Sequence, residues 1–287
     1  MDLNRYETPA AFRQALEDRL NRMARDQAVD VQRLRRKVAF DRLLSRLFQS
    51  PGSPWILKGG YAMELRIAAA RTTRDIDLTL THVIDAPSPE ALNDSIRRQL
   101  QAATTSEVPD HFNFLIGAPV MDLEAAPYGG ARFPVEARLA GRIFARFHLD
   151  VAAGDVIVEP VIEAEGVDWL QFAGIPRCRV RMISGEQQFA EKIHAYTLPR
   201  EGKVNSRVRD MIDLYLLVEA GLDIAYTEEC LEKTFTRRNT HAQPGRLDPP
   251  PTAWARTFAA LARECGISSQ IETAFQVVSK FYESIGQ

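Results

Sequence analysis

The stretch from Trp55 to Leu80 constrains the fold more than any other part of this 287-residue chain. Its first residues, Trp55 to Leu57, are apolar and include an aromatic and a β-branched side chain, which predicts a buried strand. A Lys-Gly-Gly turn follows, and Tyr61 to Ala70 repeat apolar residues at helical spacing. Asp75 to Leu80 then alternate polar and apolar residues, which predicts a strand with one face in the core.

Two carboxylates share the polar face of that last strand. Asp75 and Asp77 are two residues apart, and side chains at i and i+2 of a strand point the same way. Neighbouring ionised carboxylates repel one another, and a divalent cation relieves that repulsion. Mg²⁺ is commonly held by one or two carboxylates together with substrate phosphates. The competing interpretation is a solvated strand face with no ligand.

The turn before the helix has the composition of a phosphate-binding site. Lys58, Gly59 and Gly60 precede the helix, and backbone N–H groups at a helix N-terminus suit an anion. A Gly-Gly pair is also common in turns without any ligand. The order of strand, Gly-Gly, helix and Asp-x-Asp strand is more specific than either motif alone.

That order resembles the signature of the DNA polymerase β-like nucleotidyltransferase superfamily. The finer pattern, LKGGYAMELR followed by RTTRDIDL, is similar to the AbiEii/MenT toxins of bacterial toxin–antitoxin systems. The spacing between Gly60 and Asp75 is slightly longer than in the superfamily generally, so the similarity is stronger to the AbiEii/MenT family.

A second segment strengthens the resemblance, which extends over roughly residues 35 to 218. AEKIHAYTLPR followed by SRVRDMIDLYLL is similar to the second signature of the family, with a lysine on one helix and an aspartate on the next. By this resemblance Lys192 contacts nucleotide phosphates and Asp210 completes the active site. A lysine there would neutralise charge that develops on the leaving pyrophosphate.

The resemblance also implies a reaction and its partners. It implies transfer from an NTP, dependent on Mg²⁺ or Mn²⁺, to the 3′ end of tRNA, with a cognate antitoxin as the protein partner. Such an addition would block aminoacylation and stop translation. Two alternatives stay open: transfer to a small-molecule or protein hydroxyl, and a non-catalytic NTP-binding regulatory module.

The superfamily pattern includes a third carboxylate on a neighbouring strand. Arg142 to Val151 predict a strand in which Ile143, Ala145, Phe147, Leu149 and Val151 form one face. The other face then carries Asp150, with Phe144 as its only apolar member. Asp150 is the predicted third carboxylate and Asp155 the alternate, whereas a solvated strand end is the competing interpretation of Asp150.

Three further residues are weaker candidates for nucleotide binding. Arg66 and Arg71 lie in the helix and the turn that precede Asp75, and Thr73 lies two residues before it. A phosphate on Thr73 would repel both the incoming nucleotide and the aspartates, so phosphorylation there is a hypothesis for regulation.

Basic residues indicate where an RNA backbone would bind. The predicted helix from Val31 to Phe48 carries six of them, and most are expected to be solvated surface charges: Arg33, Arg35, Arg36, Lys37, Arg42 and Arg46. The candidates for RNA contact are the densest part of that cluster and two pairs further along the chain: Arg35, Arg36, Lys37, Arg207, Arg209, Arg237 and Arg238.

Composition narrows the class of protein. Hydrophobic residues make up 45% of the chain, which is ample for a core, and the net charge of −2 does not by itself indicate a nucleic-acid binder. The three cysteines are scattered, which argues against a disulfide framework or a zinc site and favours a reducing cytoplasm. Neither a signal-peptide pattern nor an apolar run of membrane-spanning length is present.

The predicted fold is α/β (α+β), a polymerase β-like mixed sheet flanked by helices, with a helical C-terminal region. Residues 1–182 are predicted to form the N-terminal helices and the nucleotidyltransferase sheet domain. Residues 183–287 are predicted to form a helical region that completes the active site. Thr8-Pro9 and Ser184 are predicted to begin helices, because both have the pattern of N-terminal caps.

Overall fold

A computed structural model describes residues 6–106, 108–123, 126–200, 202 and 205–286. The chain forms two compact units, each assembled from segments that are separated in sequence. Unit 1 comprises Met1–Leu57, Arg74–Gly154 and Glu163–Met182, and unit 2 comprises Lys58–Thr73, Asp155–Ile162 and Ile183–Gln287. The chain passes from unit 1 to unit 2 for the last time between residues 182 and 183. Two earlier segments, residues 58–73 and 155–162, also belong to unit 2.

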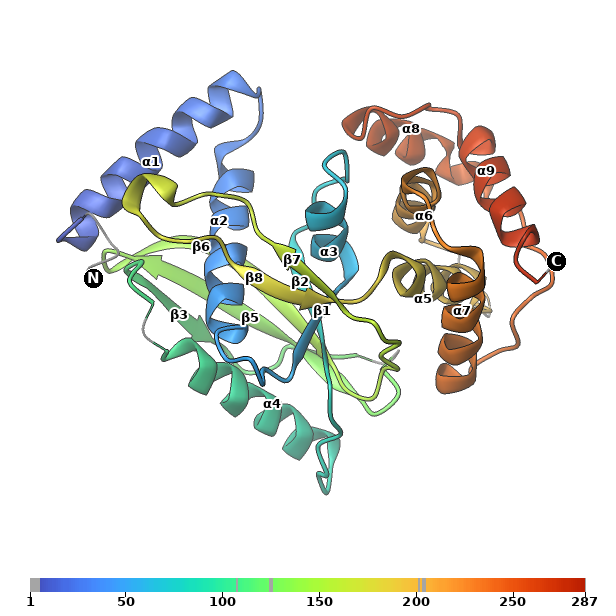
Figure 1. The fold of residues 1–287 in the computed structure, drawn as a ribbon, viewed down its shortest axis with the longest axis horizontal. Helices are drawn as coiled ribbons and strands as arrows, with labels where there is room; N and C mark the ends of the chain where they lie inside the picture. Colours follow the sequence, from blue (N-terminus) through green and yellow to red (C-terminus); the bar gives the residue numbers. More distant parts are fainter. Residues whose placement is uncertain (1–5, 107, 124–125, 201, 203–204, 287) are drawn as a thin grey trace. The chain divides into compact units, whose positions relative to one another are not determined.

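Unit 1 is built on a mixed sheet, as predicted (Figure 1). Its strands are β1 (Trp55–Lys58), β2 (Asp75–Leu80), β3 (Phe112–Ile116), β4 (Met121–Asp122), β5 (Gly130–Leu139), β6 (Arg142–Ala152), β7 (Ile162–Glu165) and β8 (Arg179–Met182). Their spatial order is β3-β5-β6-β2-β1-β8-β7, with β4 paired to β5. β2 runs parallel to β6, and β5 runs antiparallel to both β3 and β6.

Three helices of unit 1 accompany this sheet: α1 (Pro9–Asp26), α2 (Val31–Leu47) and α4 (Pro89–Thr104). The Thr8 hydroxyl accepts a hydrogen bond from the Ala11 N–H at 3.2 Å, so the predicted N-terminal cap of α1 is confirmed. α2 packs on β6, where Phe40 meets Phe147 edge-to-face with ring centroids 4.8 Å apart. The helix therefore covers the apolar face of β6.

A β-bulge corrects the predicted alternation in β6. The pairing of β5 with β6 shifts register between Ala137 and Arg138. Phe144 is consequently buried, at 4% exposure, and Ile143 is 40% exposed. The prediction placed these two side chains on the opposite faces, because strict alternation cannot anticipate an inserted residue. Beyond the bulge the alternation holds, so Asp150 lies on the polar face as predicted.

Two arginines of α2 also differ from the prediction. Arg42 and Arg46 were expected to be solvated, yet they are only 2% and 4% exposed. Arg42 pairs with Asp41, and the Arg46 Nη2 atom lies 2.7 Å from Asp110 Oδ1. Asp110 is 64 residues away in sequence, so a local pattern could not reveal this buried pairing.

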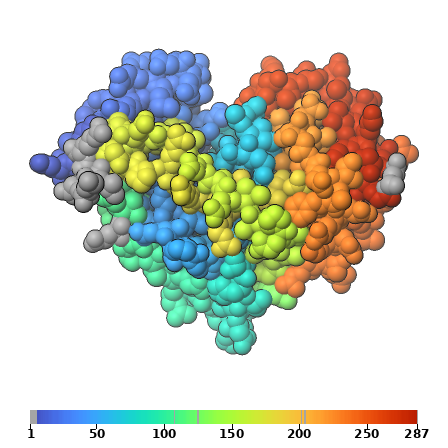
Figure 2. All heavy atoms as spheres, viewed as in Figure 1, coloured from blue at the N-terminus to red at the C-terminus, as the bar shows by residue number. Residues whose placement is uncertain are grey.

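Aromatic contacts hold a distant loop against α1. The short helix η1 (Gln171–Ala173) places Phe172 in a stack on Phe12, with ring centroids 5.9 Å apart. The Arg19 guanidinium lies over the Phe172 ring, with its Cζ atom 3.9 Å from the ring centroid, and makes a cation–π contact. In the space-filling view this segment, in yellow, lies directly against α1, in blue (Figure 2).

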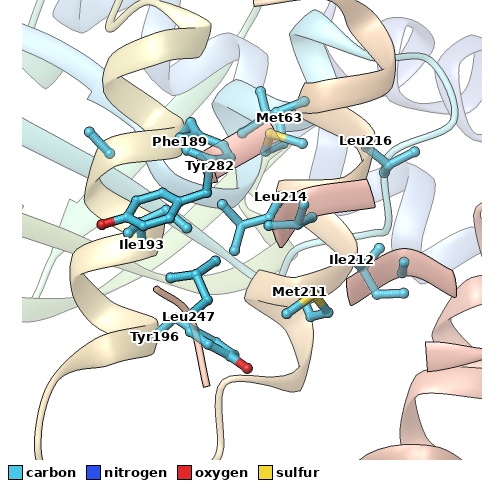
Figure 3. Packing of buried hydrophobic residues seen from close by; sticks show 14 of the residues in the cluster. Met63, Phe189, Ile193, Tyr196, Met211, Ile212, Leu214, Leu216, Leu247 and Tyr282 are labelled. Atoms are coloured by element: carbon cyan, nitrogen blue, oxygen red, sulfur yellow. The ribbon is translucent and has the colours of Figure 1, made fainter. Parts of the chain in front are cut away.

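Unit 2 is helical, with α3 (Gly59–Arg66), α5 (Gly185–Thr197), α6 (Val208–Ala220), α7 (Ile224–Arg238), η2 (Thr252–Trp254), α8 (Ala255–Glu264) and α9 (Ile271–Glu283). The Ser184 hydroxyl caps α5 by accepting from the Gln187 N–H at 3.0 Å, as predicted. Leu214 of α6 lies among Met63, Phe189 and Tyr282 in a shared core (Figure 3).

Helix α3 is shorter than predicted. It was expected to reach Ala70, but it ends at Arg66, and Ile67 is extended with φ −126° and ψ 114°. Ala68 and Ala69 are exposed, so a further helical turn would bury little apolar surface. No helix in the described part of the chain combines the length and the apolar character needed to cross a membrane.

Candidate active site

The parallel pairing of β2 with β6 brings two of the predicted aspartates together. Asp77 pairs with Asp150, and Asp75 pairs with His148. Paired residues on neighbouring strands point to the same face, about 5 Å apart. Asp75, Asp77 and Asp150 therefore lie on one side of the sheet, and all three are partly buried. We call these three residues the acid face.

An arginine that sequence analysis missed contacts the acid face. Arg132 on β5 pairs with Asp150 in the antiparallel register. Its Nε and Nη2 atoms donate to the two oxygens of Asp150, each at 2.7 Å, and Nη2 also donates to Asp75 Oδ2 at 3.1 Å. The hydrogen bonds to Asp150 raise the pKa of the Arg132 guanidinium further above its usual value. Arg132 thus remains a fixed positive charge beside the carboxylates.

The chemistry of the acid face fits a hard divalent cation. Three carboxylates and one guanidinium give a formal charge of −2 if all are ionised, and carboxylate oxygens are the ligands that Mg²⁺ prefers. Among the described residues, no three His, Cys, Asp or Glu side chains form a complete metal cluster. Mg²⁺ does not need one, because substrate phosphates and water usually complete its coordination.

The Gly-Gly turn has a conformation that requires glycine. Gly59 has a φ of +66°, in the left-handed region that other residues rarely adopt. A Cβ atom on Gly60 would lie 2.6 Å from Thr73 Oγ1, so a larger residue would displace Thr73. The Thr73 N–H donates to Glu64 Oε1 at 2.5 Å, which ties the segment before β2 to α3.

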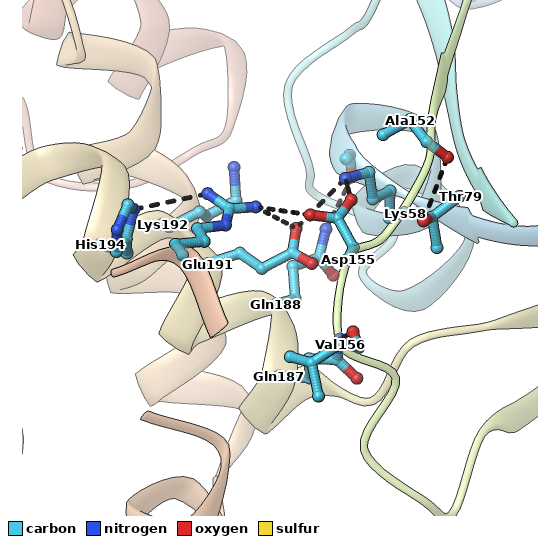
Figure 4. Close-up of polar contacts among 12 residues, drawn as sticks. Lys58, Thr79, Ala152, Asp155, Val156, Gln187, Gln188, Glu191, Lys192 and His194 are labelled. Atoms are coloured by element: carbon cyan, nitrogen blue, oxygen red, sulfur yellow. Dashed lines mark hydrogen bonds and ion pairs between the residues drawn. The ribbon is translucent and has the colours of Figure 1, made fainter. Parts of the chain in front are cut away.

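Lys58 lies in a network of opposite charges within unit 2. It pairs with Asp155, and its Nζ lies 4.0 Å from Glu191 Oε2 (Figure 4). Arg238 contacts the same two carboxylates, at 3.4 and 3.9 Å. Burial lowers the pKa of the Lys58 ammonium, but Asp155 and Glu191 outweigh burial and the net pKa is raised. Asp155, the alternate third carboxylate, is thus held by Lys58 and Arg238.

Lys192 lies in a second network, which we call the buried charge network. Its Nζ atom lies 3.0 Å from Asp210 Oδ1 and 2.7 Å from Asp213 Oδ2. Arg71 Nη2 also lies 2.7 Å from Asp213 Oδ2, and Asp213 is fully buried. Burial raises the pKa of Asp210, but Lys192 and Arg207 outweigh it and the net pKa is lowered. Burial lowers the pKa of Lys192, and the two carboxylates more than reverse this effect.

The family resemblance predicts Lys192 and Asp210 as site residues but does not include Asp213. The structure makes Asp213 the carboxylate shared by Lys192 and Arg71. The spacing of Asp210 and Asp213, i and i+3 on a helix, is the signal that could have indicated a common partner.

The other predicted residues occupy varied environments. Arg66 donates to the Ile183 carbonyl at 2.5 Å, and Arg207 Nη1 lies 3.6 Å from Asp210 Oδ2. Arg35 makes two hydrogen bonds to Glu17, at 2.9 and 2.7 Å. Arg36 lines a cavity of unit 1, Lys37 is half-buried, and Arg209 and Arg237 are exposed. The predicted RNA contacts are therefore divided between the two units, with the cluster Arg35 to Lys37 in unit 1 and the other four arginines in unit 2.

Residues 42–274 match the family model for the nucleotidyl transferase AbiEii toxin of type IV toxin–antitoxin systems. The chain belongs to the AbiEii family. The match covers most of the chain and includes the acid face, the Gly-Gly turn and the buried charge network. A search of curated proteins gives no match.

The fold of this AbiEii-family protein is similar to that of a solved structure. It is similar to MenT4, a nucleotidyltransferase toxin from Mycobacterium tuberculosis H37Rv, with a TM-score of 0.58 and 14% identity over 93% of this chain and 88% of that one. JHP933 from Helicobacter pylori also matches, with a TM-score of 0.47 and 14% identity over 89% of this chain and 92% of that one. The similarity to MenT4 supports the predicted fold class.

Proposed function

We propose that this AbiEii-family protein is a toxin that transfers nucleotides from an NTP to the 3′ end of tRNA. The observation that carries the proposal is the in-register pair Asp77–Asp150 beside Asp75, on one face of the sheet. Nucleotidyl transfer needs such a group of hard oxygen ligands, because charge develops on phosphate oxygens during the displacement.

Asp75 and Asp77 are the residues proposed to hold Mg²⁺ or Mn²⁺. Bound there, the ion would supply charge neutralisation and orientation for the triphosphate. Arg132 donates to both oxygens of Asp150, which fixes this carboxylate in place beside Asp77.

In the proposed reaction, the acceptor 3′ hydroxyl oxygen forms a bond to the α-phosphorus. The bond from that phosphorus to the bridging oxygen of the β-phosphate breaks, and pyrophosphate leaves. A carboxylate takes the hydroxyl proton. Asp150 is the proposed base because it is adjacent to Asp77, and Asp210, whose Oδ1 accepts a hydrogen bond from Lys192, is the alternative.

Lys58, Gly59, Gly60 and Lys192 are proposed to bind the nucleotide phosphates. Lys58 and Lys192 are held by carboxylates, so a phosphate would exchange with or join those partners. Arg66 and Arg71 are weaker proposals, because the Ile183 carbonyl and Asp213 already accept hydrogen bonds from them.

The test is incubation of purified protein with total tRNA, Mg²⁺ and each labelled NTP in turn. Label should appear on tRNA with wild-type protein, and Asp77→Ala should lower its rate of appearance by at least about a thousandfold, or ~4 kcal/mol. The matched control is Asp94→Ala on the exposed side of α4, which should transfer label at the wild-type rate.

Two other outcomes would redirect the proposal. Transfer of label to a small molecule or a protein, with none on RNA, would identify a different acceptor for the same chemistry. NTP binding without pyrophosphate release would indicate a non-catalytic module. Equal activity of Asp77→Ala and wild type would refute the assignment of the acid face.

A further inference from the structure

A cavity of about 570 Å³ lies in unit 1 beside the acid face. Its lining combines apolar side chains, cationic or titratable side chains and one carboxylate, and includes Leu115, Pro134, Arg36, Arg74, Arg146, His148 and Glu136. We call it the arginine groove. Its volume falls within the range of roughly 300–1,000 Å³ that is typical of ligand pockets.

Register places one end of the groove next to the acid face. His148 pairs with Asp75 across β6 and β2, and Arg74 directly precedes Asp75. Arg146 lies two residues before His148, or about 7 Å along the strand. Across β5 and β3 the groove continues to Pro134, which pairs with His148, and to Leu115. It therefore crosses three neighbouring strands and ends beside the predicted metal ligands.

The side chains in the groove suit a phosphodiester strand. Arg74 and His148 are exposed, and the Arg146 side chain is 68% exposed even though its Nη2 atom lies 2.8 Å from Glu136 Oε2. Such exposed guanidinium groups can pair with phosphate oxygens. The Nε atom of Arg36 is buried and has no hydrogen-bond partner among the described residues, which leaves a cationic donor unsatisfied.

The apolar part of the lining suits nucleotide bases. Leu115 is 52% exposed, and it shares the groove with the ring of Pro134. Single-stranded nucleic acids bind where cations follow the backbone and flat or apolar side chains accept the bases. A triphosphate alone would use the cations and leave this apolar surface without a partner.

We propose that the arginine groove binds the 3′-terminal single strand of an RNA acceptor, with its terminal hydroxyl towards Asp75. The proposal rests on the proposed nucleotidyl transfer and adds to it the location of the acceptor. Within the cluster Arg35 to Lys37, the proposal assigns an RNA contact to Arg36, which lines the groove, and none to Arg35, which is bound to Glu17.

The test measures RNA binding and transfer separately. Binding is followed by fluorescence anisotropy of a labelled single-stranded oligoribonucleotide with the CCA 3′ end of tRNA, without NTP, in an Asp77→Asn background that prevents turnover. The double variant Arg74→Gln/Arg146→Gln should weaken binding by about ten- to a hundredfold, and the slope of log K against log salt should fall by about 1.4.

The matched control is Arg179→Gln on β8 of the same unit. Arg179 is 82% exposed at its side chain and pairs with Glu165 at 3.2 Å, much as Arg146 pairs with Glu136. It does not line the groove, so its variant should bind RNA like the Asp77→Asn parent. In the otherwise wild-type protein, the groove variant should raise the KM for RNA and leave the KM for NTP unchanged.

The outcomes distinguish this proposal from the one on which it rests. Wild-type affinity for RNA in the double variant would refute the groove, even if transfer to tRNA occurs. An equal loss of NTP binding would also refute it, since the groove would then hold the incoming nucleotide. Groove-dependent RNA binding without any transfer would support the groove and refute the proposed reaction.

Discussion

The acid face of unit 1 and the buried charge network of unit 2 combine the same kinds of side chain in opposite ways. On the acid face, Arg132 donates to two of the three carboxylates, Asp150 and Asp75, and the side chains of Asp75 and Arg132 are about one third exposed. In the network, Lys192 and Arg71 match Asp210 and Asp213 in number, and all four have side chains at most 13% exposed.

This difference indicates whether the acid face and the buried charge network can each bind a further ion. A partly exposed group of carboxylates can accept a cation from solution. A balanced buried network has little capacity for another ion, and each charge in it depends on its partners. The acid face is thus suited to binding a cation, whereas Lys192 can bind a phosphate only by sharing or changing its carboxylate partners.

Removing the lysine from the buried charge network should have the largest effect on stability. Lys192→Met keeps the length of the side chain but leaves Asp210 and Asp213 with less positive charge nearby. We expect a loss of about 3 kcal/mol in the free energy of unfolding at pH 7, measured by urea denaturation. Lys280→Met, an exposed position on α9, should change it by less than about 0.5 kcal/mol.

The loss of stability caused by Lys192→Met should depend on pH. The pKa of Asp210 is lowered in the folded protein, so its ionised form stabilises the fold above the unfolded pKa of about 3.9, and this contribution is lost as the pH falls through the folded pKa. Lys192→Met should reduce that contribution. The difference in stability between wild type and variant should therefore narrow below about pH 4. A difference that stays constant to pH 2 would contradict the importance of this pairing.

Removing the arginine from the acid face should have a smaller effect, in the opposite direction. Arg132→Gln deletes the positive charge that competes with a divalent cation. For a charge about 6 Å away in a water-like dielectric, we expect Mn²⁺ to bind about tenfold more tightly, as measured by electron paramagnetic resonance. The transfer rate should fall, because Asp150 loses the group that holds it.

Arg138→Gln is the control for that experiment. Arg138 lies on the same strand and bonds to Glu136, so its variant should leave Mn²⁺ affinity unchanged. Weaker or unchanged Mn²⁺ binding by Arg132→Gln would contradict the idea that the Arg132 charge competes with a divalent cation. The acid face would then, like the buried charge network, depend on its internal ion pairs.

An ion pair that is more exposed at its arginine than the buried charge network provides the smallest expected effect. Arg35 and Glu17 join α2 to α1 with an Nη2–Oε2 distance of 2.7 Å, and their side chains are 24% and 14% exposed. Glu17→Gln should cost about 0.5 kcal/mol in urea denaturation, because solvent screens such pairs. A loss as large as that of Lys192→Met would show that burial does not explain the difference between the two kinds of pair.

The longer strands, such as β2 and β6, most of the helices and the polar-face position of Asp150 agree with the prediction, because these features follow from local periodicity and capping. The short strands β4, β7 and β8 were not predicted. β2 has the predicted bounds, α2 ends one residue before the predicted end at Phe48, and α5 follows the predicted cap at Ser184. The fold class followed from the two family signatures. The proposed roles of the site residues remain predictions that the experiments above test.

What sequence analysis missed depends on contacts between distant residues. Arg132 lies 18 residues from Asp150 and 57 from Asp75, and Asp213 lies 142 residues from Arg71. Periodicity shows which face a side chain occupies but not which charge lies opposite. The bulge beside Arg138 was missed for a related reason, since it is a property of the strand pair.

The interleaved composition of unit 2 has a consequence for how the protein is made. Gly59, at the start of α3, accepts a hydrogen bond from Gln188, which is 129 residues later in the chain. A ribosome that synthesises from the N-terminus therefore releases α3 long before its packing partners. The core around Met63 forms only once the last helices have emerged. Translation that stops early would thus yield fragments without a complete unit 2, and we expect them to be harmless to the cell that makes them.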